Sequence, residues 1–187
     1  TKFGQVYVRP GADLSHYSTY GLVDCQVEFK KNWMRNQNSN RISLSNRVTN
    51  DDVNRIKENL SKSCDEHFRQ SLEAEPAYKL VDSFDHGDAI MVLRPNIVNL
   101  DVNSPDVRNS GMSRSYTTDA GEMTLVLELL DGSSGEVLVR ILDRESGTDK
   151  GRMQWTNSVT NKADANRILK RWTAQLRKGL DEVTAKQ

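Results

Sequence analysis

The clearest hydrophobic pattern in the sequence runs from Gly121 to Arg144 and predicts a β-hairpin. Apolar and polar residues alternate on both sides of a short segment, Asp131–Gly135, that consists of Asp, Gly and Ser. Such alternation gives a strand one apolar face, and these residue types favour tight turns. Shorter patterns predict further strands at Gln5–Gly11, Leu22–Lys30, Tyr78–Phe84 and Ala89–Leu100. Within the last of these, Pro95 predicts an edge, a bulge or a break.

Two longer segments have the spacing of amphipathic helices. Apolar residues recur three and four positions apart in Asn50–Glu73 and again in Lys162–Thr184. This spacing gives each helix a single apolar stripe. Thr49 and Asn161 precede the two segments and are suitable N-caps. Pro76 follows the first segment and is expected to end that helix.

Together these elements predict an α+β fold. Each amphipathic helix needs an apolar surface to cover, and strands with one apolar face provide it. We therefore expect a mostly antiparallel sheet of about five strands covered by two long amphipathic helices. The length fits a single domain over residues 1–187. Polar loops are expected near residues 31–48, 101–120 and 145–153.

The balance of charge removes some classes of function from consideration. The chain has 26 Lys and Arg residues against 26 Asp and Glu residues, which gives a formal net charge of zero. Nucleic-acid binders usually carry an excess of basic residues that displaces counterions from phosphates, so we expect no nucleic-acid partner. No stretch of the sequence is as long and apolar as the roughly 18 residues of a transmembrane helix.

Candidate chemistry is sparse. Cys64 and His67 are spaced to face one ion, but two ligands do not make a zinc site, and no C-x-x-C or H-E-x-x-H motif supplies the others. No phosphate-binding glycine loop occurs, so the sequence predicts neither a metal nor a cofactor and favours a non-enzymatic protein. An enzyme of unrecognised type would need titratable groups such as His16, Asp82 and His86 to converge in one cleft.

The two cysteines allow two interpretations. Cys25 falls on the inward face of the predicted strand Leu22–Lys30, and Cys64 falls in the apolar stripe of the first helix. If that helix covers that strand, the two sulfur atoms face the same core. A disulfide between them would stabilise the fold by about 4 kcal/mol on the loop-entropy model. Two buried free thiols are the alternative, because free cysteine is among the most buried residue types.

One polar segment has the composition of an interaction surface. Residues 101–120 contain Arg108, Met112, Arg114 and Tyr116, which are residue types favoured at protein interfaces. Long loops without secondary structure are uncommon unless they are functional or disordered. The segment is either a partner-binding loop or an unstructured surface excursion, and the sequence leaves both interpretations open.

Three segments resemble a known family. They are V-Y-V-R-P-G-A-D-L-S-H-Y near the start, L-R-P-N-I-V-N-L-D-V-N-S-P-D in the middle, and the last helix with its tryptophan. These segments and the hairpin resemble a bacterial family of predicted lipoproteins, domain of unknown function 3313, over nearly the whole chain. Gly132 departs from the resemblance, because a serine is expected after the aspartate.

The resemblance implies a location but no chemistry. It implies a periplasmic envelope protein of Gram-negative bacteria, held to the outer membrane by a lipid on a cysteine upstream of Thr1. The family has no assigned activity and no catalytic residues that could be transferred to this chain. Because the periplasm is oxidising, the resemblance agrees with a disulfide between Cys25 and Cys64.

Three functional hypotheses follow, in order of preference. The first is a non-enzymatic envelope module that acts as a binding or accessory domain for another envelope component, with an envelope protein as the expected partner. The second is a small-molecule or lipid-binding protein, which needs a sizeable apolar pocket between helix and sheet. The third is the enzyme of unrecognised type.

Overall fold

The computed structural model describes residues 2–39, 41, 44, 47–83, 89–102, 115–117, 121–146, 154–156 and 158–184. Over these residues the fold is α+β, with three helices, a seven-stranded mixed sheet and a separate two-stranded sheet. The helices are α1 (Trp33–Ser39), α2 (Asn50–Glu73) and α3 (Ser158–Thr184). The strands are β1 (Gln5–Val8), β2 (Thr19–Leu22), β3 (Gln26–Phe29), β4 (Lys79–Val81), β5 (Ile90–Asp101), β6 (Ser115–Thr117), β7 (Glu122–Asp131), β8 (Val137–Ser146) and β9 (Gln154–Thr156).

The main sheet is mixed, which corrects the expectation of a mostly antiparallel sheet of about five strands. Its order is β1-β8-β7-β5-β2-β4, and β3 also pairs with β5. The pairs β1–β8, β8–β7 and β7–β5 are antiparallel, whereas β2 and β3 run parallel to β5 and β4 runs parallel to β2. The α+β class is confirmed, but the parallel pairs could not be predicted from local patterns.

The segment Leu22–Lys30, predicted as one strand, forms parts of two. β2 pairs with the first residues of β5, and β3 pairs with the last ones. Between them the chain turns toward α2, where the Cys25 N–H donates to Asp65 Oδ1 at 2.8 Å and the Cys25 carbonyl accepts from Ser61 Oγ at 2.7 Å. These bonds to the helix interrupt the strand.

This interruption also explains the position of Pro95. The residue lies inside β5, opposite Leu127, and is fully buried in the middle of the sheet. The expected edge or break in β5 is therefore wrong, and the register shift of this strand falls later, between Val98 and Asp101. On the other side of β5, β2 has ended at Leu22 and β3 has not begun. The missing N–H of a proline is tolerated where a neighbouring strand is broken.

The first long helix follows its sequence signals. α2 spans the predicted residues Asn50–Glu73, and Thr49 is its N-cap. Thr49 Oγ1 accepts from the Asp52 N–H at 3.2 Å, and Asp52 Oδ2 accepts from the Thr49 N–H at 3.0 Å. This reciprocal capping box satisfies two backbone donors that the helix leaves unpaired. Ala74 is the C-cap, two residues before Pro76.

Other boundaries differ from the predictions. α3 begins at Ser158, so Asn161 lies inside the helix and is not its cap. The polar segment near residues 31–48 contains α1, whose Trp33 stacks on Phe29 at 4.1 Å between ring centroids. β6 lies within residues 101–120 and pairs with β9. The partner of β6 is distant in the sequence, so local composition does not reveal this strand.

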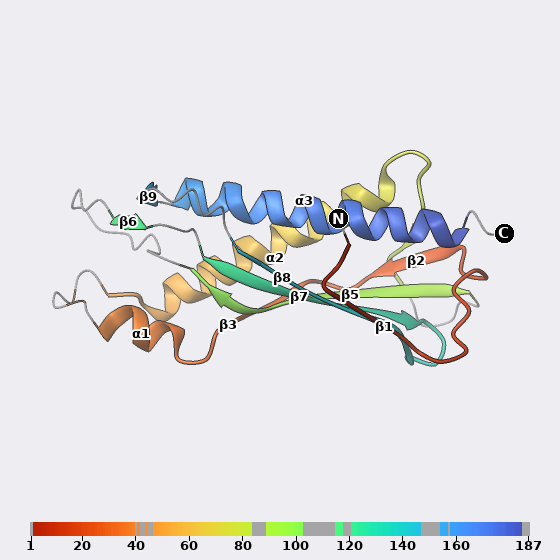
Figure 1. Cartoon of the computed structure of the whole chain (residues 1–187), viewed down its shortest axis with the longest axis horizontal. Helices are drawn as coiled ribbons and strands as arrows, with labels where there is room; N and C mark the ends of the chain where they lie inside the picture. The colour runs from red at the N-terminus through yellow and green to blue at the C-terminus, as the bar shows by residue number, and fades with distance from the viewer. Residues whose placement is uncertain are drawn as a thin grey trace.

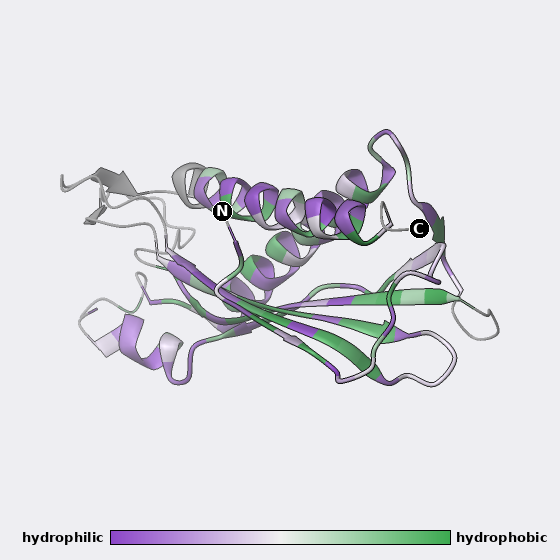
Figure 2. Ribbon diagram, turned by 45° about the vertical axis from the view of Figure 1, so that its right-hand side comes forward, coloured by the Kyte–Doolittle hydropathy of each residue, from purple (hydrophilic) through white to green (hydrophobic). Residues whose placement is uncertain are grey.

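The core lies between the helices and one face of the main sheet. α2 and α3 both cover this face (Figure 1), and the hydropathy colouring shows apolar residues on the sides that meet (Figure 2). Trp172 of α3 is fully buried, and its Nε1 donates to Asp143 Oδ2 of β8 at 2.7 Å. Large, almost fully buried side chains fill this layer: Phe68, Leu72, Leu93, Ile97, Leu125, Leu127, Leu169 and Trp172.

Two cross-links tie α2 to its surroundings. Cys25 and Cys64 form a disulfide with a Cα–Cα distance of 6.2 Å, so of the two interpretations the structure contains the bridge. At the C-terminal end of α2, the Arg177 side chain of α3 is only 12% exposed. It donates to the carbonyl oxygens of Ser71, Ala74 and Pro76, and the first two of these bonds are 2.9 Å long. Arg177 thus satisfies carbonyls that a helix end otherwise leaves unpaired.

Candidate functional site

The face of the main sheet opposite α2 and α3, here called the open face, carries a row of charged side chains. Arg94 of β5, Glu128 of β7 and Arg140 of β8 are directly opposite one another in register. Within the described residues no helix covers the centre of this face (Figure 1). An antiparallel sheet commonly leaves one face to solvent or to a partner.

Glu128 is the centre of this row. Its Oε2 accepts from Arg94 Nε and Nη2 at 2.9 and 2.6 Å, and its Oε1 accepts from Arg140 Nε and Nη2 at the same distances. The Glu128 side chain is only 10% exposed, whereas the two arginine side chains are 43% and 52% exposed. Burial acts to raise the pKa of Glu128, but the hydrogen bonds and charges of the two arginines outweigh it, so the pKa is lowered.

The outermost strand beside this face is exposed and apolar. β1 is at the end of the strand order, and among the described strands it pairs with β8 alone. Val6, Tyr7 and Val8 are 51%, 58% and 56% exposed. Of the four large hydrophobic side chains that are exposed in the described part of the chain, three lie in this strand. Proteins usually protect sheet edges by keeping them short or with charges, prolines or covering segments; β1 is short, at four residues, but contains neither a charge nor a proline.

A shallow groove runs along β1 and β8. Its volume is about 550 Å³. Two of its lining residues, Tyr7 and Arg140, are opposite one another in register and therefore share the open face. The groove combines apolar walls with two arginines, and its lining residues are Tyr7, Val8, Arg9, Val137, Leu138, Arg140 and Leu142.

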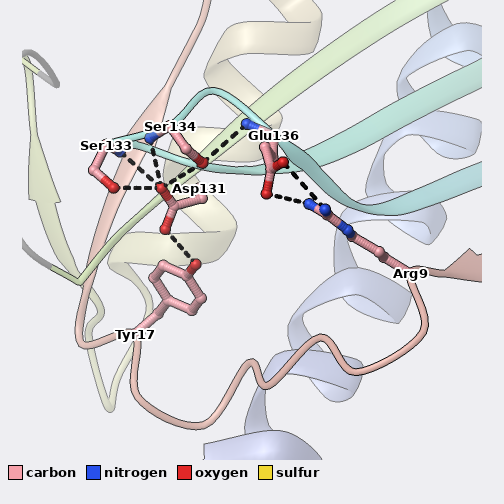
Figure 3. A network of polar contacts seen from close by, with 6 residues as sticks. All are labelled: Arg9, Tyr17, Asp131, Ser133, Ser134 and Glu136. Atoms are coloured by element: carbon pink, nitrogen blue, oxygen red, sulfur yellow. Dashed lines mark hydrogen bonds and ion pairs between the residues drawn. The ribbon is translucent and has the colours of Figure 1, made fainter.

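The turn between β7 and β8 closes one end of this region (Figure 3). Asp131 Oδ1 accepts from the N–H and hydroxyl groups of Ser133 and Ser134, at 2.6 to 3.0 Å. Asp131 Oδ2 accepts from the Tyr17 hydroxyl at 2.6 Å. Arg9 forms an ion pair with Glu136, which joins the end of β1 to the start of β8. The turn and the edge strand are therefore held together by side chains.

Gly132 and Gly135 meet the backbone demands of this turn. Gly135 has a positive φ of 71°, which glycine adopts without strain. The N–H of Gly132 donates to the Ile90 carbonyl at 2.8 Å, and a Cβ at this position would lie 2.9 Å from that oxygen. The close approach accounts for glycine at position 132, where the resemblance led us to expect serine.

The turn network does not supply acid–base chemistry at neutral pH. Hydrogen bonds from Ser133, and then from Tyr17, lower the pKa of Asp131. Burial, and then the bond to Asp131, raise the pKa of Tyr17. The carboxyl group is therefore ionised and the phenol protonated across the neutral range, whereas a general acid or base works best with a pKa near the working pH. This network anchors the turn.

Those candidate catalytic residues that the structure describes are not brought together in one cluster. His16 is exposed and its ring contacts Tyr17 at 4.1 Å between centroids. The Asp82 side chain is 95% exposed and lies 3.7 Å from Arg69. His86 lies outside the described residues. Cys64 is disulfide-bonded and so is not a free thiolate ligand beside His67.

Most of the predicted partner-binding loop lies outside the described residues. This applies to Arg108, Met112 and Arg114, so the prediction for them stays a prediction. The backbone of Tyr116 belongs to β6 and is opposite Trp155 of β9. Sequence reasoning missed β1 as a surface, because the alternation in Gln5–Val8 looks the same for a covered strand and for a bare edge strand.

Among the described residues, no group of three or more His, Cys, Asp or Glu side chains is placed to hold a metal ion. In the same part of the chain, no helix has both the length and the apolar character needed to span a bilayer.

Comparison with known proteins identifies the family. No curated protein matches the sequence. Solved structures similar to the chain include the PelC dodecamer of Paraburkholderia phytofirmans (11% identity, TM-score 0.44, 92% of this chain and 96% of that one). Others are a Helicobacter pylori protein described as a hemagglutinin homologue (10%, 0.49, 90% and 88%) and a Xanthomonas campestris protein (13%, 0.42, 95% and 91%). The family model described as "Protein of unknown function (DUF3313)" matches residues 2–176, so the chain belongs to this family.

Proposed function

We propose that the chain is a non-enzymatic module of the bacterial cell envelope that binds another envelope protein on its open face. The observation that carries the proposal is the strip formed by β1 and β8. This strip combines exposed apolar side chains with half-exposed arginines beside a groove of about 550 Å³. Aromatic residues and arginine are the types most enriched at protein interfaces.

The charges of the strip and of the neighbouring row on β5 and β7 suit a partner with acidic groups. Arg9, Arg94 and Arg140 surround two carboxylates, those of Glu128 and Glu136. Each arginine has five N–H donors in a planar fork. Side chains that are half exposed keep part of this capacity for a partner. We therefore expect carboxylates of the partner to meet Arg94 and Arg140.

The disulfide supports the proposed location. Disulfides persist in oxidising compartments such as the periplasm and are rare in the cytosol. The family resemblance implies an anchor to the outer membrane through a lipidated cysteine upstream of Thr1, and this anchor is part of the proposal. Alkylation of the denatured, unreduced protein taken from cells should find no free thiol. Two free thiols per chain would contradict the proposed location.

Site-specific photocrosslinking in intact cells tests the binding function. A photoreactive residue at Arg144, which has a side chain 70% exposed, lies on β8 beyond the residues that pair with β1 and leaves Arg9 and Arg140 in place. The matched control has the same residue at Glu66, an exposed position on α2. We expect Arg144 to trap one recurring foreign protein that Glu66 does not trap. The absence of any foreign adduct at Arg144, or identical adducts at both positions, would overturn the proposal.

The layer between helices and sheet does not favour the small-molecule alternative. Phe68, Trp172 and Leu127 are fully buried there, so the described part of this layer is filled by side chains. A ligand pocket of the expected size would require such side chains to move. We therefore propose the docking function alone.

A further inference from the structure

We propose that β1 pairs antiparallel with β1 of a second copy of the chain, with Tyr7 at the two-fold axis. The inference goes beyond the proposed function, because it concerns association of the protein with itself. It starts from an edge strand in which Val6, Tyr7 and Val8 are each more than half exposed. The pairing would join two main sheets into one continuous sheet.

The outward-facing backbone groups of β1 belong to Val6 and Val8. The Arg9 N–H donates to the Leu138 carbonyl at 2.8 Å, so the backbone groups of Arg9 point toward β8. Tyr7, two residues before Arg9, is opposite Arg140, and its backbone groups point the same way. Backbone groups of alternate residues point to opposite sides of a strand. The N–H and C=O groups of Val6 and Val8 therefore point away from β8, toward the free edge.

These four groups define one symmetric register. If Val6 exchanges both backbone hydrogen bonds with Val8 of the second copy, symmetry gives Val8 the same exchange with Val6. Tyr7 then lies opposite Tyr7 of the second copy in a pair without mutual hydrogen bonds, where Cα atoms are about 4.5 Å apart. A two-fold interface uses the same patch on both copies, and this register meets that requirement.

The sequence of the strand is self-complementary in this register. Gln5-Val6-Tyr7-Val8-Arg9 places valines on both sides of a central tyrosine. Val6 and Val8 are opposite Ile141 and Val139, so both valines point to the helix-covered side of the sheet, and Tyr7 points to the open face. Every apolar side chain therefore meets an apolar side chain of the second copy, and aromatic and β-branched cross-strand pairs are favourable.

The charges also permit this pairing. Arg9 would lie opposite Gln5 of the second copy, so no two like charges face each other in the strand. The charge of Arg9 is already balanced by Glu136. Like charges directly opposite one another destabilise a strand pair. A foreign strand would need its own matching pattern, whereas a second copy supplies one by symmetry.

Disulfide trapping tests the register in the purified full chain. In the proposed dimer, Tyr7→Cys places two thiols on opposite strands at about 4.5 Å between Cα atoms, within the range for a disulfide. The control Gln5→Cys has the same exposure class and lies on the same face of β1. In the proposed dimer, the Cα atoms of position 5 in the two copies would lie four residues apart along the strand direction, or roughly 13 Å.

Under mild oxidation we expect Tyr7→Cys to form a covalent dimer at least about tenfold faster than Gln5→Cys, with the bond between Cys25 and Cys64 intact by mass spectrometry. Equal rates for the two variants, or a Tyr7→Cys protein that stays monomeric, would overturn the proposal.

A second variant tests the backbone bonds. In Val8→Pro the lost N–H is one that points away from β8, so the pairing of β1 with β8 is kept. Because a four-residue strand buries little surface, we expect the wild-type dimer to form in a concentration-dependent way in sedimentation equilibrium. Val8→Pro should weaken dimerisation roughly tenfold or more, since two hydrogen bonds are lost by symmetry.

This measurement is distinguishable from the test of the proposed function, although both proposals use β1. A wild-type chain that is monomeric at every concentration, or a Val8→Pro variant that dimerises normally, contradicts the pairing. Either result leaves the capture of a foreign protein at Arg144 untouched. Failure of that capture in turn does not affect the dimer.

Discussion

The two outer edges of the main sheet are built differently. At one edge, β4 has an exposed lysine, Lys79, followed by Leu80 and Val81, which are half buried. Tyr78, just before β4, donates to Asp181 of α3 at 2.7 Å and packs under Arg177 at 4.6 Å from its ring centre. At the other edge, all four residues of β1 are exposed.

The two edges differ in how firmly the rest of the chain holds them. The half of the sheet with β2, β3 and β4 is fastened to the helices by a disulfide and by Arg177. β1 is held by its pairing with β8 and by an exposed ion pair between Arg9 and Glu136. The unpaired N–H and C=O groups of a sheet edge without charged side chains form a template for strand pairing. We infer that one edge is completed within the chain and the other is left for a partner.

The largest loss of stability should come from the disulfide. Replacing Cys25 and Cys64 by Ala removes a bridge across 39 residues. The loop-entropy model gives a decrease of about 4 kcal/mol in the free energy of unfolding, because the unfolded chain regains conformational freedom. Urea denaturation measures this change. A decrease below about 1 kcal/mol would contradict this estimate, because the bridge would then do little to restrict the unfolded chain.

The next largest effect should come from Arg177. Arg177→Ala removes three hydrogen bonds to the end of α2 and the ion pair with Asp181. We expect a loss of about 2 kcal/mol in the free energy of unfolding, because the Arg177 side chain is only 12% exposed and its hydrogen bonds and packing are lost together. The neighbouring Lys178 has a side chain 78% exposed, so Lys178→Ala is the matched control and should change little. Equal effects of the two substitutions would contradict the role of Arg177.

A smaller and pH-dependent effect is expected at Glu128. Its pKa in the folded protein is lowered below the ordinary value of 4.5. The stabilisation by its charge is therefore fully present above that value and is lost as the pH falls through the lowered pKa. Glu128→Gln should cost about 1 kcal/mol at pH 7, because solvent screens both arginines.

The difference between wild type and Glu128→Gln should shrink as the pH falls below 4.5. Unfolding curves at several pH values measure it. Glu136→Gln is the comparison: Arg9 also lowers the pKa of Glu136, but both side chains of this ion pair are about half exposed, so the difference should have the same sign and be smaller. A constant difference across the pH range would contradict the assignment.

The smallest effect on stability should occur at β1. Tyr7→Lys should change the free energy of unfolding by less than about 0.5 kcal/mol, because the side chain is exposed. The same variant should lose self-association through charge repulsion across the two-fold axis. Leu80→Lys, at the opposite edge, is the contrasting variant. Leu80 packs against the core, so its replacement should lower the free energy of unfolding and the melting temperature. Similar melting temperatures for the two variants would remove the distinction between the edges.

The elements that the sequence predicted correctly are those determined by residues close to one another in the chain. The cap at Thr49 and the apolar stripe that follows it set α2, and the alternation around Asp131–Gly135 sets the β7–β8 hairpin. In these segments the residues that determine the structure are close in the sequence. The cysteine pair is an intermediate case, because two predicted faces had to be brought together before the bridge could be proposed.

Long-range contacts explain what the sequence did not reveal. Cys25 interrupts a strand because its partner atoms are on α2, and Pro95 is buried because the neighbouring strand ends beside it. The exposure of Tyr7 depends on its place at the end of the strand order, which alternation alone does not encode. The candidate site could therefore not be located from the sequence.

Hydrogen exchange of individual β1 amides tests the central claim, that this edge is an association surface. The Tyr7 amide faces β8 and should be protected at every protein concentration, which makes it the internal reference. The amides of Val6 and Val8 should exchange fast in dilute protein and become protected as the concentration rises. Fast exchange of Val6 and Val8 at all concentrations, with Tyr7 still protected, would contradict the account.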